Sequence, residues 1–289
     1  MVYEIKVLSD RKGSNPGGVC NLPTRGSPTR AYFKYCHTNR TRNSALSVEN
    51  QPIYEAITLQ LARQLGLQTV DFYALLNQGK DVHFTGWKDV GINSDPDGRK
   101  SYFISRYIPK SVIGSESPNT DERQRSSVIL DSRDDMVRMA KILNKDKAYL
   151  ESILVADVLN KRQNYVYYPS DLNEGQIVYL DLGCSFVRAV NGIIEVPKAL
   201  EQLTAKESRR LRGRLDGISI ISANDLDVVD LGAIADGLRS MKINTLNPVG
   251  KSSLDRLLPE KEIEEIYGYI LQGLTSSVSE FRKRDLMLD

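Results

Sequence analysis

Hydrophobic residues in the first hundred positions fall mostly into short, strand-like runs separated by polar turns. The runs that predict strands are residues 1–9, 30–37, 67–76 and 101–108. One segment has helical spacing instead, because apolar residues recur every four positions from Ile53 to Leu65 and Gly66 follows as a C-cap. The N-terminal part is therefore predicted to be mostly β-structure with one helix over residues 50–66.

Later segments of the chain have the periodicity of amphipathic helices. Helices are predicted over residues 134–144, 146–159, 197–215, 225–241 and 259–284. A β-hairpin over residues 165–180 interrupts them, with residues 171–175 as its turn. Residues 111–135 are polar and rich in Ser, Asp and Arg, so we expect a loop or mobile insertion there.

These patterns predict an α+β fold of two lobes. The β-rich N-lobe covers residues 1–109, the mainly helical C-lobe covers residues 110–289, and a hinge lies near Tyr107. A chain of 289 residues is long enough for two lobes with a real core.

The amino-acid composition indicates the class of protein but no particular binding partner. A hydrophobic content of 40% and a net charge of +2 indicate a soluble globular protein with no overall preference for polyanions. No apolar run approaches the roughly 18 residues of a membrane span, and the N-terminus lacks the apolar region of a signal peptide. The odd cysteine count of three, without CxxC spacing, favours reduced thiols and a cytoplasmic location.

Asp181 has the most informative chemical context in the chain. It follows the apolar run 178–180 and precedes Gly183, which places a carboxylate at a strand end before a glycine turn. Asn164 lies just before the same hairpin and offers a second oxygen. Mg²⁺ prefers such oxygen ligands, and an Asn and an Asp on either side of a hairpin hold the metal in kinase-type phosphoryl transfer. A simple turn at Asp181 and a helix cap at Asn164 are the structural alternatives.

Residues with complementary chemistry precede this pair. Ser14, Gly17 and Gly18 belong to a glycine-rich segment whose backbone N–H groups can approach phosphates. Lys34 on the next strand supplies a positive charge, and Glu55 on the following helix can pair with it and fix its direction. The structural alternatives are a hairpin turn at the glycines and a solvated strand edge at Lys34.

The order of these parts resembles the HipA-like and CtkA-like bacterial kinases, a branch of the protein-kinase/phosphoinositide-kinase superfamily. Residues 55–67 are similar to the family helix in which a Glu begins a run that ends in Leu-Gly-Leu. Residues 14–18 resemble the glycine-rich loop, residues 32–34 the lysine strand, and residues 154–157 the helix leading into the catalytic loop. The resemblance covers roughly residues 10–190.

The resemblance implies a two-lobed protein-kinase-like fold and an ATP- and Mg²⁺-dependent kinase, most simply one acting on Ser or Thr of a protein. It assigns Asn164 and Asp181 to the metal. Nucleotide binding is assigned to Ser14, Gly17, Gly18, Lys34, Glu55, Arg106, Tyr107 and Ile108. It also implies a toxin or effector role, with a protein substrate and an antitoxin-like or regulatory protein partner, in the cytoplasm or in a host cytosol after secretion.

The catalytic loop departs from the family pattern, in which an Asp stands five positions before the metal-binding Asn. That position here is Leu159, and Lys161 stands near where the family has an Asp-Arg pair. The family Asp accepts or orients the proton of the attacking hydroxyl. Three interpretations follow: Asp157 reaches the site from the preceding helix, Lys161 supports transfer electrostatically, or the protein binds nucleotide with little catalysis. The catalytic candidates are Asp157, Lys161 and Asn164.

Other classes of function stay open beside a protein kinase. A nucleotide-binding pseudokinase would act as a regulatory binding module, and a small-molecule or phosphoinositide kinase would use the same ATP site. A nucleic-acid or scaffold protein would use the basic residues 209–214, but Glu207 and Asp216 flank them as on a solvated helix face. Nucleic acid is therefore not expected as a partner.

Overall fold

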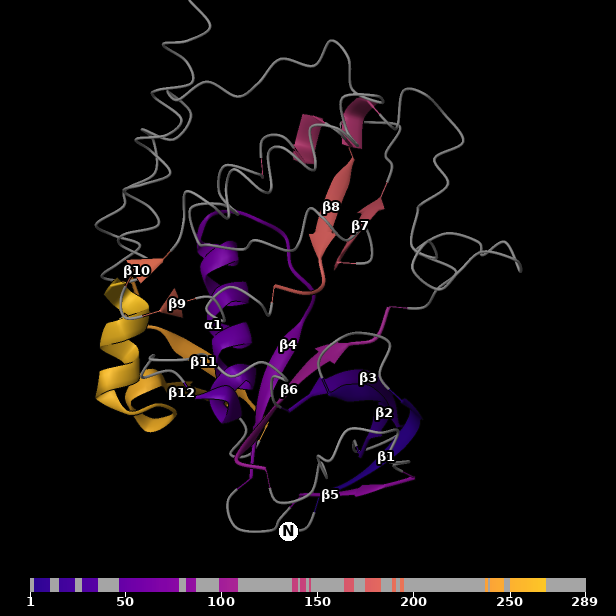
Figure 1. The fold of residues 1–289 in the computed structure, drawn as a ribbon. Helices are drawn as coiled ribbons and strands as arrows, with labels where there is room; N and C mark the ends of the chain where they lie inside the picture. Colours follow the sequence, from indigo (N-terminus) through magenta and orange to yellow (C-terminus); the bar gives the residue numbers. More distant parts are fainter. Residues whose placement is uncertain are drawn as a thin grey trace, which may run out of the picture.

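The structure is a computed structural model, in which α1 (Gln51–Gln64) packs against an eight-stranded sheet formed by the described residues (Figure 1). The described residues are 3–10, 16–23, 28–35, 47–77, 82–86, 99–108, 137–139, 141–143, 146, 164–168, 175–182, 189–190, 193–194, 237–238, 240–246 and 250–268. No helix within these ranges is long and apolar enough to cross a membrane.

The sheet has the strand order β12-β11-β4-β6-β3-β2-β1-β5. Its strands are β1 (Tyr3–Asp10), β2 (Gly17–Leu22), β3 (Thr29–Lys34), β4 (Phe72–Leu76), β5 (Val82–Thr85), β6 (Ser101–Arg106), β11 (Lys242–Thr245) and β12 (Gly250–Ser253). Neighbouring strands are antiparallel, except that β1 pairs with β5 and β4 with β11 in parallel.

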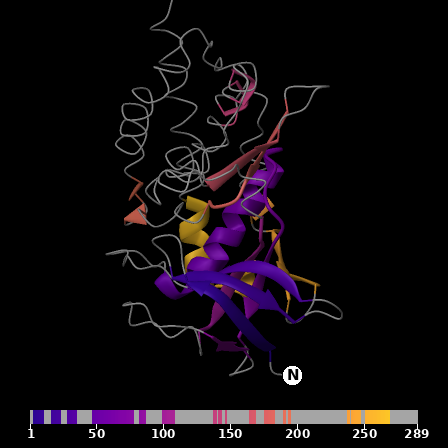
Figure 2. The same cartoon turned by 90° about the vertical axis from the view of Figure 1, so that its right-hand side faces the viewer.

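Smaller elements surround this sheet. Two-stranded sheets are formed by β7 (Tyr165–Tyr168) with β8 (Gln176–Tyr179) and by β9 (Ala189–Val190) with β10 (Ile193–Ile194). Short 3-10 helices are η1 (Val48–Asn50) and η4 (Leu254–Arg256). Residues 260–268 are helical and lie beside α1 in both views (Figures 1 and 2).

The predictions for the first hundred residues are largely confirmed. Strands β1, β3, β4 and β6 lie within or close to the predicted segments, and α1 occupies the predicted helix. After α1, Gly66 has a left-handed φ of 82°, and the Leu67 N–H donates to the Ala62 carbonyl at 2.9 Å. The left-handed Gly66 and this hydrogen bond together form the glycine C-cap that the sequence predicts. The hairpin predicted over 165–180 is present as β7 and β8.

Strands β2, β5, β9, β10, β11 and β12 were not predicted. β11 and β12 bring residues 242–253 into the N-terminal sheet, where Thr245 of β11 pairs with Ala74 of β4. These strands are only four residues long and mostly polar, so their local periodicity carries no signal. The sheet therefore includes residues that the sequence assigned to the segment 110–289, and the division into two lobes stays a prediction.

The fold class, α+β, is confirmed by the sheet and its covering helix. Within the predicted C-terminal helices, the described residues 137–139, 141–143, 146, 237–238 and 260–268 are helical, whereas residues 240–241, at the end of the predicted helix 225–241, are not. The predicted helix at 197–215 lies outside the described residues, as does the predicted insertion over 111–135.

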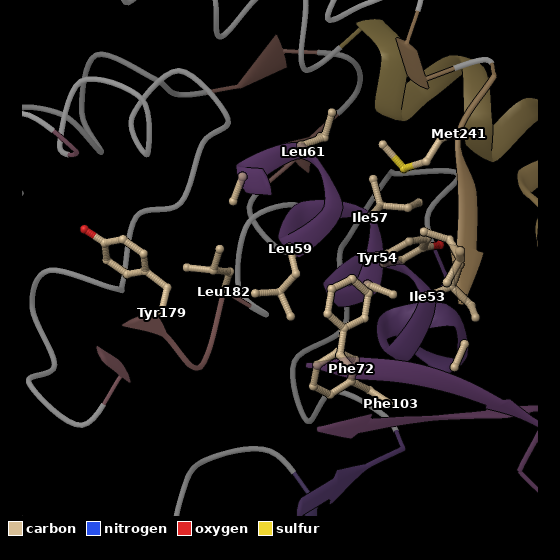
Figure 3. Close-up of a cluster of buried hydrophobic side chains, with 14 of the residues drawn as sticks. Ile53, Tyr54, Ile57, Leu59, Leu61, Phe72, Phe103, Tyr179, Leu182 and Met241 are labelled. Carbon is tan, nitrogen blue, oxygen red and sulfur yellow. The ribbon is translucent and has the colours of Figure 1, made fainter. Parts of the chain in front are cut away.

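A hydrophobic cluster makes α1 the centre of the structure (Figure 3). Phe72 of β4 and Phe103 of β6 stack at 5.9 Å beneath α1. The cluster also contains Tyr179 and Leu182, at the end of the β7–β8 hairpin, and Ile263 of helix 260–268. The placement of α1 therefore depends on the sheet, the hairpin and the C-terminal segment (residues 242–268) together, because all of them bury apolar surface against it.

Candidate functional site

Lys34 is the last residue of β3, and its side chain lies on the face of the sheet that α1 covers. It stands opposite Phe103 of β6, a member of the cluster beneath α1, and directly opposed residues of antiparallel strands share a face. The Lys34 ammonium lies 5.8 Å from the centre of the Phe103 ring. Lys34 is only 7% exposed, so a solvated strand edge, the structural alternative, is wrong.

Lys34 joins two carboxylates from distant parts of the chain, and we call Lys34, Glu55 and Asp181 the Lys34 cluster. The Lys34 Nζ lies 2.7 Å from Oε1 of Glu55 on α1 and 2.8 Å from Oδ1 of Asp181 after β8. The Glu55 side chain is 1% exposed, whereas that of Asp181 is 38% exposed. A buried cation thus faces a buried carboxylate on one side and a carboxylate open to solvent on the other.

The three charges change one another's proton affinity. Burial alone would lower the pKa of Lys34, but the charges of Asp181 and Glu55 outweigh it and raise that pKa, so the ammonium stays charged. Burial raises the pKa of Glu55 to about 7, against the opposing effect of Lys34. The second oxygen of Glu55, Oε2, is buried and has no hydrogen-bond partner among the described residues. Glu55 is therefore close to its protonation point at neutral pH.

Asn164 and Asp181 lie side by side at the open end of the β7–β8 hairpin. The Asn164 carbonyl accepts hydrogen bonds from the backbone N–H groups of Leu180 at 2.7 Å and Asp181 at 3.4 Å. The structure thus brings together the two residues predicted as metal ligands. Within the described ranges no group of three His, Cys, Asp or Glu side chains is placed to hold a metal ion. One carboxylate and one amide still fit Mg²⁺, which binds through one or two protein carboxylates when phosphates and waters supply its other oxygens.

The position of Asp181 is set by the segment between α1 and β4. Tyr179, two residues before Asp181, receives a hydrogen bond from the Val70 N–H and donates its own N–H to the Gln68 carbonyl, both at 2.9 Å. Thr69 forms an isolated parallel bridge with Tyr179. The strand that ends at Asp181 is therefore tied to the chain that leaves α1.

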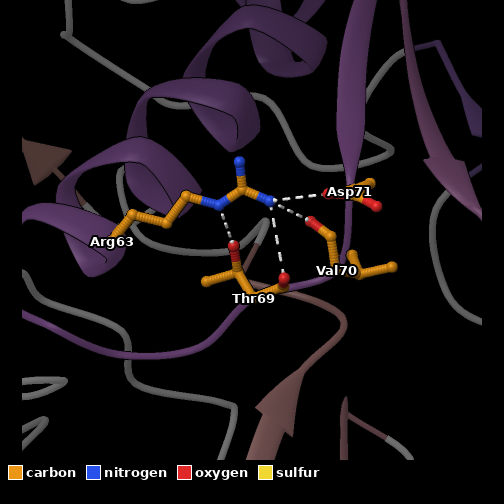
Figure 4. Close-up of polar contacts among 4 residues, drawn as sticks. All are labelled: Arg63, Thr69, Val70 and Asp71. Atoms are coloured by element: carbon orange, nitrogen blue, oxygen red, sulfur yellow. Dashed lines mark hydrogen bonds and ion pairs between the residues drawn. The ribbon is translucent and has the colours of Figure 1, made fainter.

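Arg63, near the end of α1, holds this connecting segment in place (Figure 4). Its Nε donates to the Thr69 hydroxyl at 2.6 Å, and its Nη2 donates to the Val70 carbonyl at 3.0 Å. The same nitrogen lies 3.4 Å from the Asp71 carboxylate, and the guanidinium lies 4.9 Å from the centre of the Phe72 ring. No local sequence pattern predicts this role, although the planar fork of arginine suits several acceptors at once.

Gly17 and Gly18 lie in strand β2, which corrects both the predicted glycine-rich loop and the alternative of a hairpin turn at these residues. Gly17 stands opposite Lys34 and Gly18 opposite Phe33. A Cβ atom at Gly17 would overlap the Phe33 carbonyl oxygen, and one at Gly18 would overlap the Ser9 carbonyl oxygen. Glycine is needed here because β1, β2 and β3 approach too closely for a side chain. Contact of Gly17 and Gly18 with phosphate stays a prediction.

The predicted hinge residues follow β6, at the other end of the strand pair that carries Lys34. Arg106 pairs with Ala31, three residues before Lys34, which corresponds to about 10 Å along the strand. The Tyr107 N–H donates to the Arg30 carbonyl at 3.4 Å, and the Arg30 guanidinium lies 5.3 Å from the centre of the Tyr107 ring. Ile108 is half-buried beyond them.

Ser14, Asp157 and Lys161 lie outside the described residues, so the glycine-rich loop before β2 and the catalytic loop before Asn164 stay predictions.

Comparisons with known proteins do not assign the chain to a family. No family model and no curated protein matches it. A solved structure of the Helicobacter pylori proinflammatory kinase CtkA is similar over 100% of this chain and 99% of that chain, with 12% sequence identity and a TM-score of 0.39. At this distance the similarity assigns neither an activity nor a site.

Proposed function

We propose that this protein is an ATP- and Mg²⁺-dependent kinase whose phosphate acceptor is a Ser or Thr hydroxyl of a protein. The observation that carries the proposal is the Lys34 cluster, in which Lys34 bridges the buried Glu55 and the partly exposed Asp181 at 2.7 and 2.8 Å. Charged residues with perturbed proton affinity concentrate at functional sites.

A purely structural role explains this cluster less well. Burying an ion pair removes its members from water, and the desolvation penalty often exceeds the attraction that is gained. A stabilising pair would also have no need of Asp181, whose side chain is 38% exposed. An exposed carboxylate beside a buried ammonium instead suits a ligand that combines a cation with phosphates, since each part meets the opposite charge.

Each residue of the proposed site has a distinct role. Lys34 binds phosphate oxygens, and Glu55 keeps its ammonium directed toward them. Asp181 and the Asn164 amide would hold Mg²⁺, which when bound neutralises the charge that develops during phosphoryl transfer. The separation of about 10 Å along the strands between Lys34 and Arg106, where the predicted hinge begins, suits a nucleotide with its base at the hinge and its phosphates at Lys34.

Thermal unfolding in the presence of ATP, with and without Mg²⁺, tests the proposal. Ligand at about 100 times its Kd stabilises by roughly 2.7 kcal/mol, which corresponds to about 4 °C for a chain of this size. We expect this shift in the wild type only when Mg²⁺ is present, and no shift in Asp181→Asn. Glu264→Gln is the matched control, because Glu264 is an exposed carboxylate far along the chain from the cluster. Absence of a shift in the wild type, or an equal shift in Asp181→Asn, would contradict the proposal.

A nucleotide-binding pseudokinase is the second candidate, and one observation favours it. The position five residues before Asn164 is Leu159, where an active kinase of the resembling family carries an Asp. A pseudokinase would show the Mg²⁺-dependent shift without transferring phosphate. An assay for transfer of labelled phosphate from ATP to protein, lipid or small-molecule acceptors separates these cases. If transfer is found, the variants Asp157→Asn and Lys161→Met identify which residue supports it.

A further inference from the structure

A carboxylate from the C-terminal segment is buried at the start of α1, the helix that carries Glu55. Glu262 lies in helix 260–268 and is 6% exposed. The helix reaches this place because β11 and β12 pair with the sheet beside β4, and because Leu257 and Ile263 pack in the hydrophobic cluster around α1. The C-terminal segment and α1 thus form one packed unit.

Glu262 binds two residues at the beginning of α1. The Asn50 side-chain amide donates to both carboxylate oxygens of Glu262, at 3.0 and 2.8 Å. The Tyr54 hydroxyl donates to Oε2 at 2.6 Å and accepts from the Ser47 N–H at 2.8 Å. Lys100 reaches the other side of the Asn50 amide, donating to its oxygen at 3.3 Å.

In the described part of the chain, the groups that donate hydrogen bonds to the Glu262 carboxylate are neutral. Burial of this charge is therefore unfavourable, and packing alone does not explain it. Burying a carboxylate is unfavourable unless its oxygens are hydrogen-bonded, and neutral donors compensate less than a cation does. Asn50 is the N-cap residue of α1 but makes no capping hydrogen bond: its side-chain oxygen accepts from Lys100, and its side-chain NH2 group donates to Glu262. The negative charge of Glu262 instead lies at the N-terminus of the helix, where the helix dipole favours it.

The two residues that bind Glu262, Asn50 and Tyr54, lie close in sequence to Glu55, the member of the Lys34 cluster on α1. Tyr54 directly precedes Glu55, and Asn50 lies just over one helical turn before it. Glu55 is almost fully buried, and only one of its oxygens is bonded. The 2.7 Å contact between Glu55 and Lys34 therefore depends on where the backbone of α1 lies. A small displacement of the helix start moves Glu55 away from Lys34.

We propose that Glu262 is a positioning residue for the nucleotide site: it fixes the start of α1 and so holds Glu55 against Lys34. The proposal rests on the nucleotide site of the proposed function. It makes the C-terminal segment part of that site, although Glu262 itself touches none of the Lys34 cluster in the described structure.

Mg·ATP affinity, measured by titration calorimetry, provides the first test. We expect Glu262→Gln to weaken binding by about tenfold, in the range for residues that act through another. Glu264→Gln, on the same helix and exposed, should bind like the wild type. In a Glu55→Gln background, Glu262→Gln should cause no further loss, because the residue through which it acts is already altered. A folded Glu262→Gln protein with wild-type affinity, or an equal loss in both backgrounds, would overturn the proposal.

Hydrogen exchange of the apo protein tests the same proposal without nucleotide. Glu262→Gln should accelerate amide exchange over residues 51–57 by roughly tenfold relative to Glu264→Gln, while β2 and β3 keep their protection. Unchanged exchange over 51–57 would overturn the proposal. If the wild type fails to bind Mg·ATP, the proposed function fails, and this exchange experiment still decides whether Glu262 positions α1. Tyr54→Phe, which removes one hydrogen bond to Glu262, replaces Glu262→Gln if that variant does not fold, with the same expected and overturning results.

Discussion

The Lys34 ammonium lies 2.8 Å from the Asp181 carboxylate, which joins the end of the third strand to a hairpin far along the chain. The contact places the single buried cation of the Lys34 cluster next to its one partly exposed carboxylate. Because Glu55 also binds Lys34, at 2.7 Å, the ammonium has a fixed direction before any ligand arrives. Such preorganisation is what a site for transferring phosphate requires.

Replacement of Lys34 by Met is expected to destabilise the fold as well as the site. Removing one partner of a buried ion pair leaves Glu55 uncompensated and costs about 3–5 kcal/mol, less whatever protonation of Glu55 recovers. Urea unfolding measures the loss. Lys6→Met is the control, since Lys6 is an exposed strand residue of β1. Equal free energies of unfolding for the two variants would contradict the buried position of Lys34.

The raised pKa of Glu55 predicts a particular pH dependence of stability. The pKa of Glu55 is about 7 in the folded protein and about 4.3 in an unfolded chain. The folded state therefore binds the proton more tightly, and this contribution to stability is present below pH 4.3 and is lost as pH rises to about 7. The free energy of unfolding of the wild type minus that of Glu55→Gln should fall across this window. A constant difference from pH 4 to 8 would show that the Glu55 pKa is not raised.

Gly17→Ala is expected to distort the sheet next to Lys34. The new methyl group would overlap the Phe33 carbonyl of β3, so the strands must separate, at a cost of about 1–3 kcal/mol. Gly268→Ala is the matched control: among the described residues, nothing lies within 4 Å of a Cβ there, and the residue is helical. That variant should be neutral or stabilising by up to about 1 kcal/mol. Comparable thermal stability of both variants would contradict the close approach of β2 and β3.

Arg63→Met should loosen the connection between α1 and the hairpin that ends at Asp181. The loss of hydrogen bonds to Thr69 and Val70 is expected to lower the free energy of unfolding by about 1–3 kcal/mol. Mg·ATP affinity should fall as well, because Tyr179 is bonded to the same segment. Arg256→Met, at an exposed arginine, is the control. An Arg63→Met protein that unfolds and binds Mg·ATP like this control would show that the connection does not place Asp181.

The pairing of Lys34 with Glu55 was predicted from the order of a strand lysine and a helix glutamate, as in a phosphoryl-transfer site, and the structure contains this contact at 2.7 Å. Both residues lie on elements with strong periodicity, and their charges and order along the chain suggest the contact. The hydrogen bonds between Asn50 and Glu262 could not be predicted in this way. The two residues are 212 positions apart, and β11, which brings them together, is short and polar. Gly17 shows a third case: the glycine was noticed, but its close approach to β3 depends on strand pairing that sequence alone does not define.

The decisive measurement is the affinity for ATP of the wild type, Lys34→Met, Asp181→Asn and Lys6→Met, determined by titration calorimetry with and without Mg²⁺. We expect the wild type and Lys6→Met to bind ATP in an Mg²⁺-dependent manner. We expect the other two variants to lose roughly 100-fold or more in affinity, which corresponds to about 2.7 kcal/mol. Binding of equal strength in all four proteins, or none in the wild type, would contradict the assignment of the Lys34 cluster as a nucleotide site.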